Sequence, residues 1–102
     1  MARKITEQAI DCFLQGKTFH LNNTSITRDE TTTRFLLWGN CIAYYFNTEK
    51  EIYFSLCGYN TATTRERLRG LGLNIRTKNG KIFWGNHEID SRKYHNSNIK
   101  AF

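Results

Sequence analysis

The chain has 102 residues, of which 39% are hydrophobic, 14% aromatic and 24% charged. A chain of this length builds one hydrophobic core, and its composition is typical of a globular domain. These values exclude a large multi-site enzyme, a secreted disulfide scaffold and a membrane protein. Because residues 1–7 contain no apolar signal segment, we expect a cytoplasmic protein whose three cysteines stay reduced.

The first part of the chain predicts a helix followed by a hairpin. Residues 4–15 carry apolar side chains at helical spacing and predict an amphipathic helix that ends near Gly16. Two short strands are expected over residues 17–21 and 24–28, joined by an Asn-Asn turn.

The strongest strand signal lies in the middle of the chain. Three runs rich in β-branched and aromatic side chains cover residues 31–38, 41–46 and 51–57. A two-residue Gly39-Asn40 turn would join the first two runs, and a four-residue loop would join the last two. The sequence therefore predicts a three-stranded antiparallel meander.

The expected turns also predict which side chains share a face, because side chains alternate along a strand. One face would hold Leu36, Trp38, Cys41, Ala43, Tyr45, Ile52, Phe54 and Leu56. The other would hold Phe35, Leu37, Ile42, Tyr44, Phe46, Tyr53, Ser55 and Cys57. We expect Trp38 to anchor the core. Because one helix covers only one face, we expect Phe35, Tyr44, Phe46 and Tyr53 to form an interface with a partner or a second copy.

A second helix and a second hairpin are predicted after the meander. Thr63 followed by Glu66 has the spacing of a capping box, which predicts a short helix over about residues 63–71. A turn at residues 78–80 predicts another hairpin, and a short strand follows it. Residues 91–102 are polar and basic without periodicity, and we expect a C-terminal tail or extension.

The expected fold class is therefore α+β, with one domain over residues 1–90. Its antiparallel meander sheet would pack against the N-terminal helix and the second short helix.

Charge is distributed unevenly along the chain. The formal net charge is +6, and residues 1–60 contain six basic and six acidic side chains, so the whole excess lies in residues 61–102. Such asymmetry indicates a polyanion partner, a negatively charged protein surface, or only a soluble basic face.

Nucleic-acid or nucleotide binding is the leading interpretation of this basic segment. Arg65 and Arg69 would share one face of the second helix, beside the free N–H groups of its first turn. Threonine hydroxyls at the helix start and cations on the following hairpin would add anion contacts. The candidate anion-binding residues are Arg65, Arg67, Arg69, Arg76, Lys78, Lys81, Thr63 and Thr64.

Metal and catalytic motifs are weak in this sequence. The cysteines and histidines show neither Cys-x-x-Cys nor His-x-x-x-His spacing, and buried small hydrophobic positions explain the cysteines better, so we expect no metal and no cofactor. Phosphate-loop, nucleophile-elbow and metalloprotease motifs are also missing, which favours binding over catalysis. A small nuclease is a weaker alternative.

Residues 23–26, 36–43, 55–68 and 81–86 carry a recognisable pattern. They form an Asn-Thr strand, a Gly-Asn hairpin followed by Ile-Ala, a Gly-aromatic-x-Thr-x-Thr-Thr-x-x-Arg-Leu segment and an aromatic strand. Over residues 4–90 this resembles small accessory proteins of tailed bacteriophages, although the last turn is Gly-Asn here and Asn-Gly in that group.

The resemblance implies a phage protein that acts in the cytoplasm of a bacterial host, in host takeover or against host defence. The leading hypothesis is a non-catalytic protein that binds nucleic acid, a nucleotide signal or nucleic-acid-handling machinery. The alternative is a protein–protein inhibitor of a host enzyme or defence complex that uses the aromatic sheet face, and self-association is possible for either. No membrane association is expected.

Overall fold

The computed structural model describes residues 4–102, and their two helices and two antiparallel sheets confirm the α+β class. The large sheet has six strands in the order β1-β2-β3-β4-β5-β9, and the small sheet has the order β6-β7-β8. The elements are α1 (Lys4–Gln15), β1 (Phe19–Leu21), β2 (Thr24–Arg28), β3 (Thr32–Leu37), β4 (Asn40–Phe46), β5 (Glu51–Phe54), α2 (Ala62–Gly70), β6 (Ile75–Lys78), β7 (Lys81–Trp84), β8 (His87–Glu88) and β9 (His95–Lys100). Within residues 4–102, neither helix is long and apolar enough to cross a membrane.

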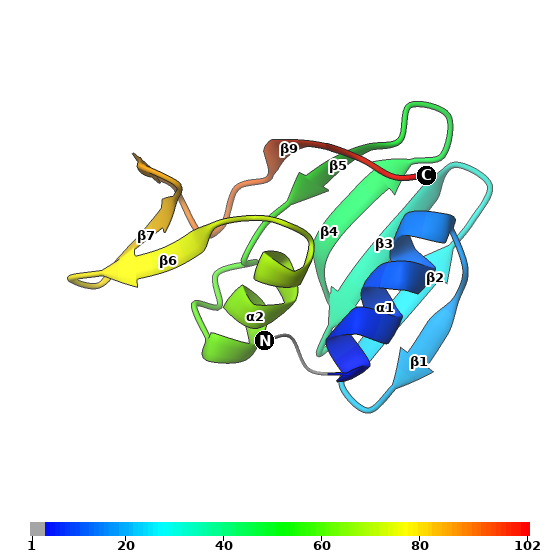
Figure 1. Ribbon diagram of the computed structural model, residues 1–102, viewed down its shortest axis with the longest axis horizontal. Coiled ribbons are helices and arrows are strands. Elements are labelled where there is room, and N and C mark those ends of the chain that lie inside the picture. Colours follow the sequence, from blue (N-terminus) through cyan, green and yellow to red (C-terminus); the bar gives the residue numbers. More distant parts are fainter. Residues whose placement is uncertain (1–3) are drawn as a thin grey trace.

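Helix α1 lies across one face of the large sheet, as Figure 1 shows, and supplies the centre of the core. The buried ring of Phe13 makes edge contacts with Phe35 at 5.5 Å and with Tyr45 at 5.1 Å between ring centroids. The Tyr45 hydroxyl donates a 2.7 Å hydrogen bond to the backbone oxygen of Phe13. Apolar packing and one buried polar contact therefore hold the end of α1 on β3 and β4.

The turn between β3 and β4 differs from the prediction by one residue. Trp38 and Gly39 form the turn, both with positive φ, and Leu37 pairs with Asn40. Two positive φ values in a two-residue hairpin are the pattern of a type I′ turn, whose twist suits the flanking strands. The expected Gly39-Asn40 turn is therefore wrong.

A bulge in β4 then sets the faces of the sheet. Phe35 pairs with Ala43 and Leu36 with Cys41, so Ile42 is the extra residue. As a result Phe35 is buried in the core, and the predicted place of Phe35 on the interface face is wrong. The expectation that Trp38 anchors the core is also wrong, because its side chain is 52% exposed at the turn.

Residues 95–100, expected within a tail, form the edge strand β9. It pairs antiparallel with β5, and the buried Ser97 hydroxyl donates a 2.7 Å hydrogen bond to the backbone oxygen of Ile52. Beyond the strand, the backbone N–H of Phe102 donates to the backbone oxygen of Leu14 in α1. Because an edge strand is held by its backbone, its polar sequence gives no apolar signal, and for this reason the strand was not predicted within the expected tail or extension.

Helix α2 begins earlier than predicted and packs closely against α1. Thr61 is its N-cap, and the Thr61 hydroxyl accepts a 3.1 Å hydrogen bond from the backbone N–H of Thr64, so the predicted cap at Thr63 is wrong. Near the other end, a Cβ atom at Gly70 would lie 2.4 Å from Cδ1 of Ile10. The absence of a side chain at Gly70 therefore permits the close approach of the two helices.

The small sheet shares its buried side chains with the large one. Ile75 and Ile82 are buried in the same hydrophobic cluster as Phe13 and Phe54, and the Trp84 ring meets Phe54 edge-on at 5.1 Å. Figure 1 shows the β6–β7 hairpin extending away from the large sheet, with its turn far from both helices. The base of this hairpin belongs to the core and its tip projects from the body.

Candidate functional site

The β6–β7 hairpin brings three of the predicted anion-binding residues onto one surface. Arg76 pairs with Phe83 and Lys78 with Lys81, and side chains at paired positions share a face. The other face carries Ile75 and Ile82, which are buried, and Thr77 and Trp84. The outward face of the hairpin, which we call the basic ribbon, therefore consists of Arg76, Lys78, Lys81 and Phe83.

Contacts within the basic ribbon leave its cations accessible. The Arg76 guanidinium lies 5.8 Å from the centroid of the Phe83 ring, and its Nε donates to the backbone oxygen of Gly85. Lys81 Nζ lies 3.9 Å from a carboxylate oxygen of Glu88, and both side chains are more than half exposed. An exposed ion pair of this kind is weak. Phe83 and Glu88 were absent from the sequence prediction because only the strand register shows that they share this face.

Of the two other arginines predicted on α2, Arg69 contacts the hairpin and Arg65 does not. Arg69 is exposed, and its Nε donates a 2.6 Å hydrogen bond to the backbone oxygen of Ile75, the first residue of β6. Arg65 is half-buried and donates from Nη1 to the side-chain oxygen of Asn60 at 2.5 Å. Arg69 thus continues the basic surface from the ribbon onto the helix.

The predicted anion contact by Arg67 is wrong, because this side chain is only 1% exposed. Its guanidinium donates to the hydroxyls of Thr6 and Thr24 and forms an ion pair with Glu66. With its donors used inside the domain, Arg67 binds the two helices together.

The threonine hydroxyls at the start of α2 form hydrogen bonds within the helix cap. The Thr64 hydroxyl is buried and lies 2.9 Å from the hydroxyl of Thr61, while Thr63 is half-buried. Since Thr61 already accepts the backbone N–H of Thr64, the first turn offers less to an anion than expected.

The second candidate surface is the face of the large sheet opposite α1. We call it the outer aromatic face and define it by Tyr44, Phe46, Tyr53 and Tyr94. The Tyr44 and Tyr53 rings stack at 5.3 Å, and Phe46 and Tyr94 meet Tyr44 edge-on at 5.7 Å and 5.2 Å. Three of these residues were predicted for one face, and Tyr94 was missed because it lies in the segment taken for a tail.

A groove of about 330 Å³ runs along this face. Thr32, Arg34 and Cys41 line it together with Tyr44, Phe46 and Tyr94, and the last two side chains are each 43% exposed. Burial raises the pKa of the Tyr44 hydroxyl, with further effects from Tyr53 and Cys41. The Tyr44 hydroxyl is therefore neutral at pH 7, and Arg34 supplies the charge in the lining.

One ion pair stands at the side of this groove. Arg34 Nη1 donates a 2.8 Å hydrogen bond to Asp29 Oδ2, and Oδ1 of Asp29 accepts the backbone N–H groups of Thr31 and Thr32. The hydrogen bond from Arg34 and these two from the backbone hold the pKa of Asp29 well below its usual value. The same hydrogen bond raises the pKa of Arg34.

Two thiols and a phenol meet at the other end of the groove. The Tyr94 hydroxyl donates to the backbone oxygen of Cys41 at 2.5 Å, and the Cys57 thiol donates to the same oxygen at 2.9 Å. Burial raises the pKa of the Cys41 thiol, and burial followed by the charges of Cys41 and Cys57 raises the pKa of Tyr94 strongly. Both raised pKa values favour the protonated groups, which are poor nucleophiles.

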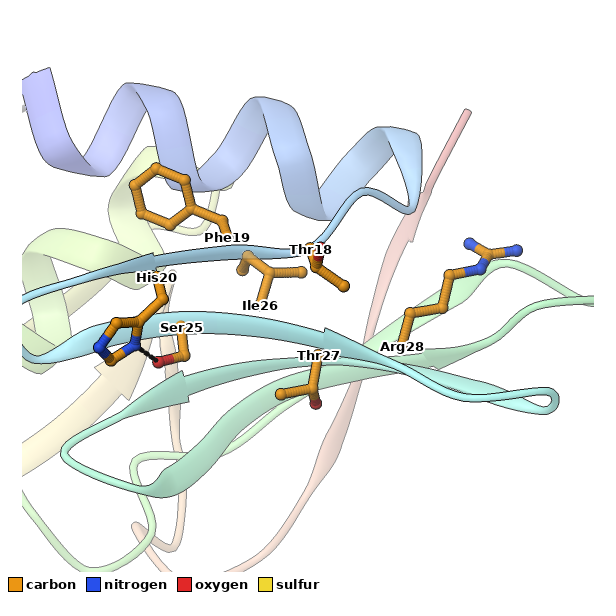
Figure 2. A pocket seen from close by; sticks show the side chains of 7 residues that line it. All are labelled: Thr18, Phe19, His20, Ser25, Ile26, Thr27 and Arg28. Carbon is orange, nitrogen blue, oxygen red and sulfur yellow. Dashed lines mark hydrogen bonds between the residues drawn. The ribbon is translucent and has the colours of Figure 1, made fainter.

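A third hollow lies on the β1–β2 hairpin (Figure 2). It is lined by Thr18, Phe19, His20, Ser25, Ile26, Thr27 and Arg28. Nδ1 of His20 lies 2.7 Å from the Ser25 hydroxyl, a contact that the sequence did not reveal. Figure 2 shows Arg28 pointing away from this pair. No carboxylate among the described residues hydrogen-bonds the His20 ring, so the third, orienting member of a catalytic triad is absent there.

Residues 4–102 contain no group of three or more histidine, cysteine, aspartate or glutamate side chains that could hold a metal ion. The three cysteines are free thiols.

Comparison with known proteins gives a family for this chain. No curated protein and no solved structure matches it significantly. The family model described as Kyanoviridae Gp96 protein matches residues 2–101, which is nearly the whole chain. The chain therefore belongs to the Kyanoviridae Gp96 protein family, a family of bacteriophage proteins.

Proposed function

We propose that this phage protein binds duplex DNA without catalysis, through the basic ribbon and the adjoining Arg69. The observation that carries the proposal is the strand register of β6 and β7, which places Arg76, Lys78 and Lys81 together on one exposed face. Arginine and lysine side chains are the usual partners of phosphate oxygens.

The shape of the hairpin supports a duplex as the ligand. The major groove of B-form DNA is wide enough for a two-stranded β-ribbon, whereas the major groove of A-form RNA is deep and narrow. The hairpin tip projects from the body, so the ribbon can enter a groove before the rest of the protein meets the backbone (Figure 1). Four lysine and arginine contacts to phosphates, three from the basic ribbon and one from Arg69, give affinity with little sequence preference.

The biological role that follows is host takeover or resistance to host defence, by occupying DNA or the machinery that handles it. Membership of a phage family supports this context. A nucleotide signal would engage the same cations, but the open surface of the basic ribbon suits an extended polyanion better. A protein–protein inhibitor that uses the outer aromatic face is the alternative if the chain does not bind DNA.

Fluorescence anisotropy with a labelled DNA duplex over a range of salt concentrations tests this proposal. About four phosphate contacts, three from the basic ribbon and one from Arg69, predict that the logarithm of the association constant falls with the logarithm of salt with a slope of about −3.6. The variant Lys78→Ala/Lys81→Ala removes two contacts and should bring the slope to about −1.8.

The matched control removes two lysines elsewhere. Lys17 follows α1 and Lys100 ends β9, at the end of the large sheet far from the hairpin (Figure 1). The variant Lys17→Ala/Lys100→Ala has the same net charge as the hairpin variant and should keep the steep slope. Equal losses in both variants would show attraction by net charge alone. Absence of salt-sensitive binding by the wild-type protein would refute DNA binding and favour the protein-inhibitor alternative.

A further inference from the structure

The outer aromatic face is left open by the rest of the described chain. Helix α1 packs on the opposite face, and α2 joins the same buried cluster through Leu68. No helix formed by residues 4–102 lies over Tyr44, whose ring is surrounded by three aromatic neighbours within the face. A contiguous aromatic patch of this kind on a folded domain marks an interaction surface.

Opposite charges stand at the two ends of this face. At one end, Glu30 and Glu49 line a hollow beside Phe46. At the other end, Tyr94 lies over β4 by its hydrogen bond to Cys41, and the exposed residues Arg92 and Lys93 directly precede it. Phe46 and Cys41 are five residues apart in β4, which separates the two ends by about 17 Å.

We propose that a second copy of this chain covers the outer aromatic face, in a two-fold symmetric dimer. In this dimer the outer aromatic faces of the two copies are stacked, and the two-fold axis lies between them near Tyr44. The axis is perpendicular to the strands, so the strands of the second copy run in the opposite direction. The acidic end of each copy then faces the basic end of the other. Glu49 and Lys93 meet in two equivalent contacts, because the acidic turn and Tyr94 both lie along β4 and β5.

This dimer both buries the aromatic side chains and pairs the opposite charges of the outer aromatic face. Aligned packing of two sheets buries the four aromatic rings of each copy between layers about 10 Å apart. Rotation about an axis parallel to the strands would bring acidic end against acidic end, so charge selects one orientation. Because the basic ribbon belongs to the other sheet, the dimer would carry two such ribbons.

Charge-reversal variants test the dimer in solution by sedimentation velocity. Glu49→Lys and Lys93→Glu each place like charges at both symmetric contacts, and each should raise the dimer dissociation constant about tenfold or more. In an equimolar mixture of the two variants, both contacts regain opposite charges, so a mixed dimer should form. The double variant Glu49→Lys/Lys93→Glu should dimerise by itself for the same reason.

The controls are Asp11→Lys and Lys17→Glu, which reverse exposed charges in or just after α1, on the opposite side of the large sheet. They should dimerise like the wild-type protein, and thermal unfolding followed by circular dichroism should show that every variant is folded.

Three results would overturn the proposal. The first is a wild-type protein that stays monomeric up to its solubility limit. If DNA also quenches the tyrosine fluorescence of this monomer, nucleic acid occupies the outer aromatic face. The second is an unchanged dimer in both single variants, which would place the dimer contact elsewhere. The third is monomeric single variants that do not recover in the mixture, which would exclude the pairing of acidic and basic ends.

Discussion

The guanidinium of Arg67 donates a 2.8 Å hydrogen bond to the hydroxyl of Thr6, which joins α2 to α1 across 61 positions of the sequence. The same guanidinium donates to the Thr24 hydroxyl on β2 and is paired with Glu66. One buried cation thus links both helices to the large sheet, and its charge is compensated within the domain.

Removal of this cation should be costly. Arg67→Ala breaks a buried ion pair and removes the donor to the Thr24 hydroxyl, and only the Thr6 hydroxyl still donates to Glu66, so the free energy of unfolding should fall by about 3–5 kcal/mol. Urea denaturation measures this value. Arg65→Ala, which changes an arginine on the surface of the same helix, should cost no more than about 1 kcal/mol. Similar values for both variants would contradict the structural role of Arg67.

The N-cap of α2 gives a second test. Thr61→Ala removes the acceptor for the backbone N–H of Thr64 and should lower the free energy of unfolding by about 1 kcal/mol. Thr63→Ala leaves that hydrogen bond intact and should have a much smaller effect. The reverse order in chemical denaturation would show that the helix begins where the capping box of the sequence placed it.

The contact between Gly70 and Ile10 predicts that replacing this helical glycine by alanine destabilises the protein. Alanine normally stabilises a helix relative to glycine, but a Cβ atom at position 70 would lie 2.4 Å from Cδ1 of Ile10. Gly70→Ala should therefore destabilise the protein by about 1–3 kcal/mol. Ile10→Val removes Cδ1, so a double-mutant cycle should show that the two changes together cost less than their sum. Strict additivity would show that Cδ1 of Ile10 is not the atom that opposes a side chain at position 70.

The turn at Trp38 and Gly39 leads to a stabilising substitution. Trp38 has a φ of 50° and is exposed, and asparagine before glycine is the preferred pair for a type I′ turn. Trp38→Asn should raise the free energy of unfolding by about 1 kcal/mol, since a bulky residue at positive φ is strained. If Trp38→Asn instead lowers the free energy of unfolding by several kcal/mol in thermal or chemical denaturation, Trp38 contributes to the core.

The pair of Arg34 and Asp29 predicts a pH dependence. Because the pKa of Asp29 is lowered in the folded protein, the pair contributes stability above the ordinary aspartate pKa, and this contribution is lost as the pH falls through the lowered value. In an NMR titration, the Asp29 carboxyl carbon should remain in its ionised form below about pH 3.9, the ordinary value for aspartate. Arg34→Gln should move the midpoint back toward that value. An unchanged midpoint in this variant would show that the backbone hydrogen bonds alone lower the pKa.

The elements that sequence analysis predicted correctly are those with strong periodicity or clear turns. Helix α1 follows from apolar spacing, and β3 to β5 follow from runs of β-branched and aromatic residues. The face of each side chain in β3 could not be predicted, since the bulge at Ile42 reverses it relative to β4, whereas the earlier turn shifts the pairs by two positions and keeps the faces. Strand β9 was missed because it is held by backbone pairing with β5, and Ser97 is its one buried side chain.

Sequence analysis also predicted only some of the residues of the candidate sites correctly. Arg76, Lys78 and Lys81 were grouped because they lie close together in the sequence, but the expected turn at residues 78–80 did not give their shared face, which follows from the pairing of Lys78 with Lys81. Arg67 was misassigned because helical spacing shows which side of α2 a residue occupies, but not that Thr6 and Thr24 lie opposite. Partners from distant positions of the sequence, such as Tyr94 over β4, are determined only by tertiary packing.

The placement of β9 affects when this protein can finish folding. Its pairing with β5 and the contact of Phe102 with Leu14 join residues near position 100 to the first helix. A nascent chain can form the central meander on the ribosome, but β5 keeps an unpaired edge until residues 95–100 have been synthesised and have left the ribosome. During that interval the exposed edge can pair with other chains, so expression of fragments that stop before His95 should give aggregates.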